Sequence, residues 1–185
     1  MKQVYKPIKE QADITRDAMI ASSRAWLAPR NAFFTKELGL NQPWSITVIY
    51  GNVAKEPALG FAAQEDFGSV DIPKLNESWF SVFPKSTLGD VCGRFNASDG
   101  GLTIYPPGPS DHSYSVSGDR STFDVTTEIL QGTRVMFMHG CFAYKTVGPP
   151  PHKSEYCFLF LPDIDPKTGQ KTYHSISCMY GNNAT

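Results

Sequence analysis

Three apolar runs near the carboxyl end dominate the pattern of this chain. They start at Arg134, His152 and Thr172, and aromatic and long or branched apolar residues make up most of each run. A Gly-Pro-Pro-Pro segment separates the first two runs, and a segment rich in Asp, Pro and Gly separates the last two. Runs of this composition between turn residues are typical of β-strands. The pattern therefore predicts three antiparallel strands between Arg134 and Tyr180, each with one cysteine.

The register of the last two strands can be predicted, because side chains alternate faces along a strand. If Cys157 lies opposite Cys178, then Leu159 faces Ile176, and the hairpin closes around the turn formers of residues 163–171. One face then carries both cysteines, Leu159 and Ile176, and we expect it to point into the core. A directly opposed, non-hydrogen-bonded pair places its Cα atoms close enough for a disulfide, so the register predicts a Cys157–Cys178 bridge in an oxidising compartment. The same register sets three further pairs: Phe158 with Ser177, Phe160 with Ser175, and Leu161 with His174.

Further strands are predicted upstream of these three. Trp44, Ile46, Val48 and Tyr50 occupy every second position of one run, so they share a face that we expect to be buried. The other predicted elements are a first strand near residues 24–34, a strand over 58–63, a short strand over 102–105, edge strands or loops over 112–116 and 121–125, and a turn of helix over 127–130 that ends at Gly132.

One domain with an N-terminal extension is the expected organisation of the 185 residues. After Pro7, residues up to 24 are mostly good or neutral helix formers without Pro or Gly, but their apolar stripe is thin. We therefore expect residues 1–23 to form a helical stalk or linker, with a homo-oligomer through this helix as the alternative. Residues 24–185 are expected to form one all-β, antiparallel domain, because 14 Pro and 15 Gly suit strands joined by long loops. Inside it, the strand pattern is lost around residues 66–122, which predicts a long irregular insertion.

Charge and cysteine usage exclude several functional classes. The net charge is −1 and Lys and Arg are scattered, so the sequence predicts no nucleic-acid partner and no polybasic contact with anionic lipid. The four cysteines form no Cys-x-x-Cys motif, which argues against zinc-ribbon and thioredoxin-like folds. Whether Cys92 pairs with Cys141 stays open at this point.

The sequence also bears on the compartment. No apolar run is long enough to span a bilayer, and no signal peptide opens the chain. The expectation is therefore either a soluble intracellular protein or a chain from which an export segment or an anchor has been removed.

Short motifs in a fixed order at both ends of the chain carry a resemblance to a known group of proteins. The motifs are Asp17-Ala-Met-Ile-Ala-Ser-Ser-Arg-Ala-Trp-Leu, Ile46-Thr-Val-Ile-Tyr-Gly-Asn, Glu56-Pro-Ala-Leu, Gly140-Cys-Phe-Ala-Tyr, His152-Lys-Ser-Glu-Tyr-Cys and Cys178-Met-Tyr-Gly-Asn-Asn-Ala-Thr. Together they resemble uncharacterised bacterial proteins with an N-terminal membrane helix. Between Asp66 and Thr122 the resemblance is weak.

The resemblance implies a fold and a location but no chemistry. It implies a short membrane-proximal helix that ends in an Arg-Ala-Trp-like step, followed by an immunoglobulin-like β-sandwich on the periplasmic face of the inner membrane. This sequence departs from the group in two places: Cys141 stands where a polar or charged residue is expected, and no anchor precedes Met1. Membrane contact is thus expected only through a missing N-terminal anchor, and the resemblance assigns no catalytic residue.

Histidines near the last three strands suggest a metal site as an alternative function. His139, His152 and His174 lie in or beside these strands, close in sequence to Cys157 and Cys178. Soft ligands on neighbouring strands suit zinc or copper. A disulfide between the two cysteines would remove both thiolates, so the first expectation is that the protein has no metal and no other cofactor.

A binding surface and a hydrolytic site are the remaining alternatives. Trp79, Phe80, Phe83 and Tyr105 would line a carbohydrate or peptide surface, although aromatic residues also pin long loops onto a core. The run Ser110-Asp111-His112-Ser113 holds the residue types of a catalytic triad, but triads assemble in space and the chain has no Gly-x-Ser-x-Gly elbow. The carboxylate pairs Asp163/Asp165 and Glu65/Asp66 fit turn and strand-end positions better than acid–base catalysis.

The expectation from the sequence is therefore a non-catalytic interaction or structural ectodomain of a bacterial envelope protein. Its partner is expected to be another envelope protein. The alternatives are a ligand- or metal-binding β-sandwich and, after it, a hydrolase.

Overall fold

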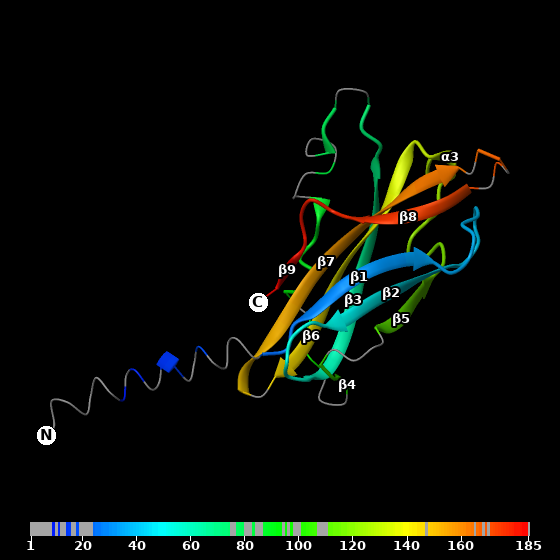
Figure 1. Ribbon diagram of the computed structural model, residues 1–185. Helices are drawn as coiled ribbons and strands as arrows, with labels where there is room; N and C mark the ends of the chain where they lie inside the picture. Colours follow the sequence, from blue (N-terminus) through cyan, green and yellow to red (C-terminus); the bar gives the residue numbers. More distant parts are fainter. Residues whose placement is uncertain are drawn as a thin grey trace, which may run out of the picture.

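The part of the chain that the structure describes contains two antiparallel sheets and a short helix between β5 and β6 (Figure 1). The structure is a computed structural model that describes residues 9, 11, 14–15, 18, 24–74, 77–79, 83, 87–93, 95, 97, 101–106, 111–146, 148–164, 166–167, 169 and 171–184. The elements in these residues are β1 (Leu27–Phe34), β2 (Trp44–Asn52), β3 (Ala58–Asp71), β4 (Leu102–Ile104), β5 (His112–Gly118), α3 (Thr127–Gln131), β6 (Arg134–Thr146), β7 (Gly148–Ile164), β8 (Lys171–Ser177) and β9 (Asn183–Ala184).

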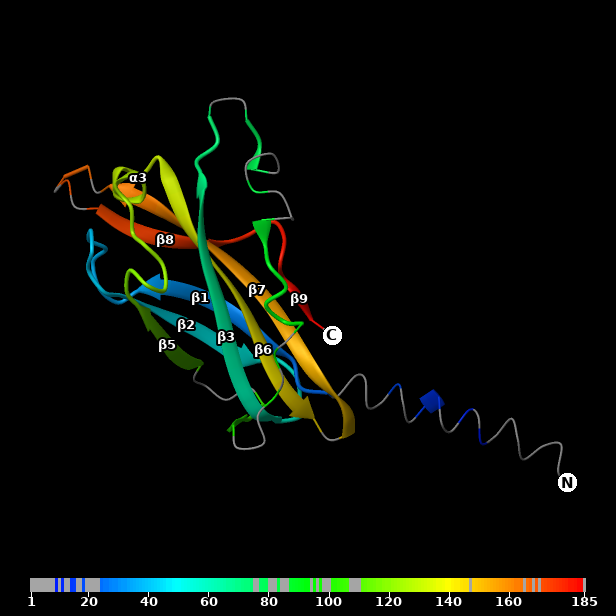
Figure 2. The ribbon, with the colours of Figure 1, turned by 180° about the vertical axis from the view of Figure 1, so that it is seen from behind.

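The small sheet has the strand order β1-β2-β5, and the large sheet has the order β4-β3-β6-β7-β8, with β9 added beside β7. Figure 2 shows the small sheet lying against the face of the large sheet. All strand pairs are antiparallel, which confirms the predicted all-β class. Residues 24–26 lead into β1, so the predicted first strand is confirmed with a slightly later start.

The main core lies between the two sheets. The predicted inner face of β2 is confirmed, because Trp44, Ile46, Val48 and Tyr50 are all at most 2% exposed. They pack in one cluster with inward residues of the large sheet: Met136, Met138, Phe142, Tyr144, Tyr156, Phe158 and Phe160. Burying a large apolar side chain contributes about 1.5–3 kcal/mol, so this cluster is the main source of stability.

A second apolar cluster covers the opposite, outer face of the large sheet. Phe83 from the segment between β3 and β4 is fully buried there, and it meets Phe137 edge to face with ring centroids 5.2 Å apart. The other members are Val70, Val135, Cys157, Leu159 and Cys178, with Ile72, Trp79, Leu88 and Leu161 packed against them. Strands β6 and β7 are therefore buried on both faces, which explains their nearly continuous apolar sequence.

The predicted register of β7 and β8 is confirmed, and three of the four residues on the predicted inward face, Cys157, Leu159 and Cys178, are buried. Leu159 pairs with Ile176, Leu161 with His174, and Cys157 is joined to Cys178 by a disulfide. Cys157 and Leu159 point into the second cluster rather than the main core, and Ile176 is 37% exposed. The outer face of β7 is covered by described residues of the β3–β4 segment, among them Phe83 and Leu88.

The predicted boundaries of the irregular insertion were too wide. Strand β3 continues to Asp71, and β4 and β5 also fall inside residues 66–122. The end of β3 was missed because residues 64–69 mix charged, small and apolar types without clear alternation. Residues 121–125 form no strand, since Asp119 holds a turn there through bonds to Ser121 and Thr122.

Two further predictions concern the helical elements. The turn of helix before Gly132 is confirmed as α3, and Gly132 ends it in the left-handed conformation (φ 76°). The predicted helical stalk over 1–23, and with it the homo-oligomer through that helix, lies largely outside the described residues.

Both pairs of cysteines form disulfides. Cys92 is bonded to Cys141 and Cys157 to Cys178, with Cα–Cα distances of 5.3 and 5.2 Å. Disulfides persist in oxidising surroundings, so the two bridges indicate an extracytoplasmic environment. Among the described residues, no helix combines the length and the apolar character that crossing a membrane requires.

Candidate functional site

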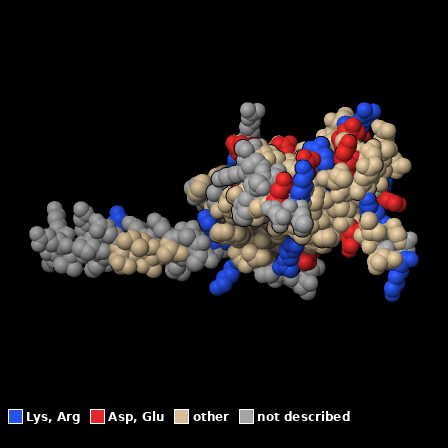
Figure 3. Space-filling view, turned by 90° about the horizontal axis from the view of Figure 1, so that it is seen from above, with Lys and Arg blue, Asp and Glu red and all other residues tan. Residues whose placement is uncertain are grey.

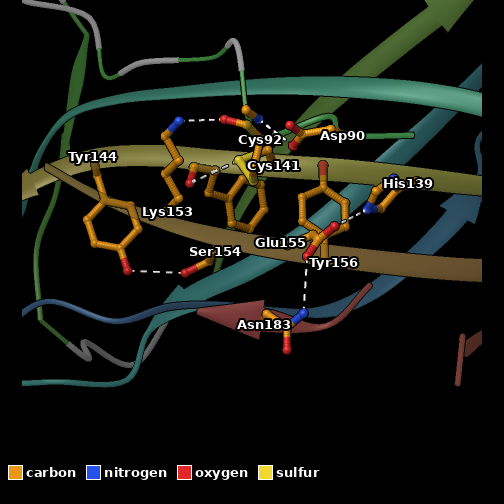
Figure 4. Close-up of a disulfide and its surroundings, with 12 residues drawn as sticks. Asp90, Cys92, His139, Cys141, Tyr144, Lys153, Ser154, Glu155, Tyr156 and Asn183 are labelled. Carbon is orange, nitrogen blue, oxygen red and sulfur yellow. Dashed lines mark hydrogen bonds and ion pairs between the residues drawn. A yellow bond between two sulfur atoms is a disulfide. The ribbon is translucent and has the colours of Figure 1, made fainter. Parts of the chain in front are cut away.

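A hydrogen-bonded side-chain group lies on the outer face of the large sheet. Nε2 of His139 on β6 is 2.7 Å from Oε1 of Glu155 on β7, and the Asn183 side-chain amide on β9 donates to the other carboxylate oxygen at 3.2 Å. Figure 4 shows Glu155 held between His139 and Asn183, with the Cys92–Cys141 disulfide nearby. His139 is completely buried, whereas the Glu155 side chain is 25% exposed. The carboxylate is thus fixed from two sides and still reaches solvent.

Glu155 lines a cleft between β1 and the carboxyl-terminal strand. We call this the edge cleft; its volume is about 390 Å³, and its walls are Trp26, Leu27, Ala28, Pro29, Ser154, Glu155, Ser177, Asn182, Asn183 and Ala184. Half of these residues are polar and half are apolar, and Glu155 is the charged one among them. The cleft exists because β8 ends at Ser177, and β9 then covers only two residues of β7.

Two main-chain donors on the outer edge of β1, which forms one wall, are already occupied. The N–H of Leu27 donates to the hydroxyl of Tyr144 at 3.4 Å, and the N–H of Ala32 donates to Oγ of Ser175 at 3.4 Å. Between them, Pro29 carries no N–H. An edge strand in this state is a poor template for an added strand.

A second polar group, the phenol–carboxyl cluster of Glu65, Tyr114 and Tyr156, lies between the two sheets. The Tyr114 hydroxyl lies within hydrogen-bond distance of the Glu65 carboxyl and of the Tyr156 hydroxyl, and the Tyr156 hydroxyl donates to Glu65 at 3.1 Å. Glu65, Gly140 and Tyr156 form one rung across β3, β6 and β7. Because Gly140 has no side chain, the Tyr156 ring can cross β6 to reach Glu65; a Cβ at Gly140 would lie 2.1 Å from its Cζ.

Burial controls the proton balance of the phenol–carboxyl cluster. It raises the pKa of Glu65, although the two tyrosine hydrogen bonds act in the lowering direction. Burial, followed by charge repulsion from the neighbouring acidic groups, also raises the pKa of Tyr114 and Tyr156, so both phenols keep their protons. The three hydrogen bonds among Glu65, Tyr114 and Tyr156 need three protons. The two phenols supply two of them, and Glu65 supplies the third when it is protonated. The cluster therefore joins the small sheet to the large sheet most favourably when Glu65 is protonated.

The raised pKa of Glu65 predicts a pH-dependent stability. A carboxyl whose pKa in the folded state exceeds its ordinary value of 4.5 contributes stability below that value, and this contribution is lost as the pH rises through the folded-state pKa. Between pH 4.5 and the folded-state pKa of Glu65, the free energy of unfolding of the natural protein should therefore fall relative to that of Glu65→Gln. Urea unfolding of both proteins from pH 4 to pH 8, on the order of one pH unit per step, measures it. A difference that stays constant with pH would contradict the assignment.

The three histidines of the predicted metal site do not come together. His152 lies opposite Tyr144, five residues along β6 from His139, which is about 17 Å in a strand. His174 lies opposite Leu161 on β8, roughly 13 Å along β7 from Cys157, the partner of His139. His152 instead bonds to Thr146 at 3.1 Å, and no group of three metal-binding side chains occurs among the described residues. One ion cannot contact all three rings.

The predicted aromatic surface is also divided. Trp79 and Phe83 pack into the second apolar cluster, where they hold the β3–β4 segment on the sheet. Tyr105 is 68% exposed beside β4 and does not belong to that cluster, and Phe80 lies outside the described residues. These residues therefore form no common surface in the described structure, because the apolar outer face of β6 and β7 takes up the first two.

The residues that the sequence suggested as catalytic candidates have structural roles where the structure describes them. Asp111 forms an ion pair with Arg30 at 2.8 Å, and the His112 ring stacks near Tyr50. Asp163 is exposed at the end of β7, while Asp165 and Ser110 lie outside the described residues. Charges of both signs lie intermixed on the face in Figure 3, so charge on that face does not single out a binding patch.

Sequence reasoning missed the two polar groups described above, although two signals pointed to them. Gly140 inside an apolar strand is a sign of close approach by another side chain. Strand β7 starts at Gly148, which pairs with Thr146 at the end of β6, and the β6–β7 register places Glu155 opposite Cys141, next to His139. Comparison of the chain with known protein families, curated proteins and solved structures gives no match.

Proposed function

We propose that this chain is a non-catalytic interaction domain of a bacterial envelope protein, held on the periplasmic face of the inner membrane through its N-terminal side. The two disulfides support the extracytoplasmic part of this proposal. The partner is another envelope component, and the edge cleft is its contact site.

The strand order supports an immunoglobulin-like architecture for the domain. β1, β2 and β5 have the order of strands A, B and E in an immunoglobulin sandwich. The order β4-β3-β6-β7 matches C′, C, F and G of the opposite sheet. Here β8 extends the second sheet, and neither disulfide joins strand B to strand F. Immunoglobulin-like domains carry many recognition functions, so function must be argued from the site.

One observation carries the proposal: the reactive side chains serve the structure, whereas the edge cleft is open to solvent and is lined by polar and apolar residues in equal number. In the described part of the chain the four cysteines are bridged, and His139 and His152 hold neighbouring strands through Glu155 and Thr146. An activated nucleophile is a hydroxyl or thiol that is hydrogen-bonded to a histidine. Among the described residues, the hydroxyl in such a contact is that of Thr146, which bonds to His152, and both residues are buried. The cleft is therefore more suited to recognition than to covalent chemistry.

A photocrosslinking experiment tests whether the edge cleft contacts a partner. Trp26 lines the cleft and is 39% exposed, so a photoreactive benzoylphenylalanine fits in its place. We expect irradiation of cells that export the full chain to give a discrete, higher-mass adduct at position 26. The same residue at Tyr105, which is 68% exposed and lies beside β4, is the matched control and should give no such adduct.

Two results would contradict the proposed interaction role. Absence of any adduct at position 26 would remove the cleft as a contact site. The same adducts at positions 26 and 105 would show unspecific labelling.

A further inference from the structure

The small sheet ends at β5 on one side, and this free edge is long and regular. All seven residues of β5 pair with β2 without a register shift, and no described strand pairs with the other side of β5. Figure 1 shows β5 as the outermost strand of this sheet. Edge strands are commonly protected from further pairing by proline, charged side chains or bulges. The sequence of β5, His-Ser-Tyr-Ser-Val-Ser-Gly, has none of these features.

The main-chain groups that β5 offers at this edge belong to Ser113, Ser115 and Ser117. In β2, the Ser45 carbonyl accepts from the N–H of Thr35, and the N–H of Val53 donates to the Trp26 carbonyl, both at 2.9 Å. The odd-numbered residues of β2 thus direct their main-chain groups toward β1, so the even-numbered ones bond to β5. The three serines lie opposite odd-numbered residues, and their own N–H and C=O groups therefore point away from β2. All three serines are exposed.

Below this edge, the large sheet extends one strand further than the small sheet. The Tyr114 hydroxyl bonds to Glu65, so β5 lies over β3, and β4 lies on the far side of β3. Leu102 on β4 shares a face with Ile104, which belongs to the main core. Ile104 is 2% exposed, but Leu102 is 69% exposed. A strand added beside β5 would lie above β4 and cover Leu102.

Leu102 lies at the level at which β5 begins. Tyr50 pairs with His112, the first residue of β5, and the Tyr50 ring stacks on Phe61 with 4.9 Å between the centroids. Phe61 in turn pairs with Leu102. A segment that follows the whole of β5 would therefore reach an exposed apolar side chain at one of its ends.

A single extended segment fits this edge better than a second copy of the chain. If β5 paired with β5 of a second copy, the two large sheets would meet in the layer below, where β4 already extends past β5 in each chain. An extended segment brings no second sheet with it. Because β5 has no Lys, Arg, Asp or Glu, the paired part of the segment needs no charged residue. Strand addition to an exposed edge is a common mode of peptide recognition, in which main-chain hydrogen bonds supply the affinity.

We propose that the free edge of β5 binds an extended, uncharged segment of a partner chain as a fourth strand of the small sheet. The main-chain groups of Ser113, Ser115 and Ser117 bond to it. Threonine or serine in the segment faces these serines, and apolar side chains at the positions between lie inward, beside Tyr114 and over Leu102. In the immunoglobulin order proposed above, this is the place of strand D beside strand E. The inference goes beyond the proposed function, because β5 and the edge cleft lie at opposite edges of the small sheet.

Hydrogen exchange followed by NMR tests the inference on the full chain. The probe is a capped Lys-Thr-Val-Thr-Val-Thr-Leu-Lys peptide, whose terminal lysines supply solubility. Without the peptide, the amides of Ser113, Ser115 and Ser117 should exchange freely, while those of Tyr114 and Val116, which bond to β2, should be protected. At saturation the peptide should slow exchange of the serine amides by at least about tenfold. The same peptide with N-methylated threonines keeps its side chains but loses the donors that face β5, so it should have no effect.

Two variants with matched controls locate the binding site. Ser115→Pro removes the central N–H of the edge; proline is tolerated where an edge N–H faces solvent, so the fold should persist and the peptide affinity should fall at least about tenfold. Ser115→Thr keeps this N–H and should bind like the natural protein. Leu102→Ser removes an exposed apolar contact and should weaken binding by at least about threefold. Ile164→Ser, at a position that is 57% exposed at the end of β7, should not change the affinity.

Several results would overturn the inference. They are no binding of the peptide, equal binding of its N-methylated form, and unchanged affinity in Ser115→Pro or Leu102→Ser. Protection of the three serine amides before the peptide is added would also overturn it: a monomer in sedimentation would then show that another part of the chain covers the edge, and a dimer would assign the edge to a second copy. If Ser115→Pro does not fold, Leu102→Ser and the N-methylated peptide decide.

Failure of this inference leaves the proposed function standing, because the edge cleft is tested separately at position 26. Tyr105 lies in the connection between β4 and β5. Any adduct that a segment on the β5 edge forms at position 105 has the mass of its own chain, which distinguishes it from the adduct at position 26.

Discussion

Replacing Cys92 and Cys141 together by alanine is expected to lower the free energy of unfolding by about 4 kcal/mol. This bridge closes the longer of the two loops, with a sequence separation of 49 against 21 for Cys157 and Cys178. A cross-link restricts the unfolded chain more when its loop is longer, and the same relation gives about 3 kcal/mol for the shorter bridge. Urea unfolding without reductant measures both double variants against the natural protein.

The Cys92–Cys141 bridge also attaches the β3–β4 segment to the outer face of β6. The neighbouring Lys153 side chain donates to the Cys92 carbonyl, and Phe83 packs against Phe137 on the same face. Loss of the bridge should therefore also make this segment the first site of proteolytic cleavage. A larger loss of stability from the shorter bridge, or cleavage elsewhere in the chain, would contradict this account.

Gly140→Ala is expected to cost about 3 kcal/mol of unfolding free energy, which combines overpacking with a weakened buried hydrogen bond. The new methyl group would lie 2.1 Å from Cζ of Tyr156, whose side chain is fully buried. The ring must move away from Glu65, which breaks the phenol–carboxyl cluster that joins the sheets. Thermal and urea unfolding measure the loss.

Two controls separate this contact from a general effect of replacing glycine. At Gly89 the added methyl would lie 3.7 Å from the Asp66 carboxylate, an ordinary contact, so Gly89→Ala should change stability by less than about 0.5 kcal/mol. In a Tyr156→Leu background the ring is absent, and the cost of Gly140→Ala should then fall by at least about half. Equal costs in the two backgrounds would show that the ring contact is not the cause.

Local patterns were sufficient to predict the strands and one hairpin register. From Trp44 to Tyr50, every second residue is a large apolar residue and is buried. This periodicity alone identified the inner face of β2. The pairing of Cys157 with Cys178 followed from counting across a short turn. Both features depend on residues that are close in sequence or strictly periodic, and such signals are visible in a single chain.

Features that depend on distant parts of the chain were not predictable in the same way. The outer face of β7 reads as apolar, but only Phe83 and its segment, more than seventy residues upstream, show what covers it. Glu65 meets Tyr156 across Gly140 at a separation of 91 residues, and no local pattern links them. The edge cleft arises where β8 ends and β9 pairs with only two residues of β7. The lengths of these strands determine the cleft, and residue composition does not reveal them.

The state of the β1 edge has a consequence for the protein at high concentration. A proline and two satisfied amide groups leave this strand few donors with which to pair to a neighbouring molecule. Growth of a continuous intermolecular sheet from this edge, as in amyloid-like fibres, is thereby disfavoured. At high protein concentration the small sheet can therefore lie open along β1 without polymerising through it.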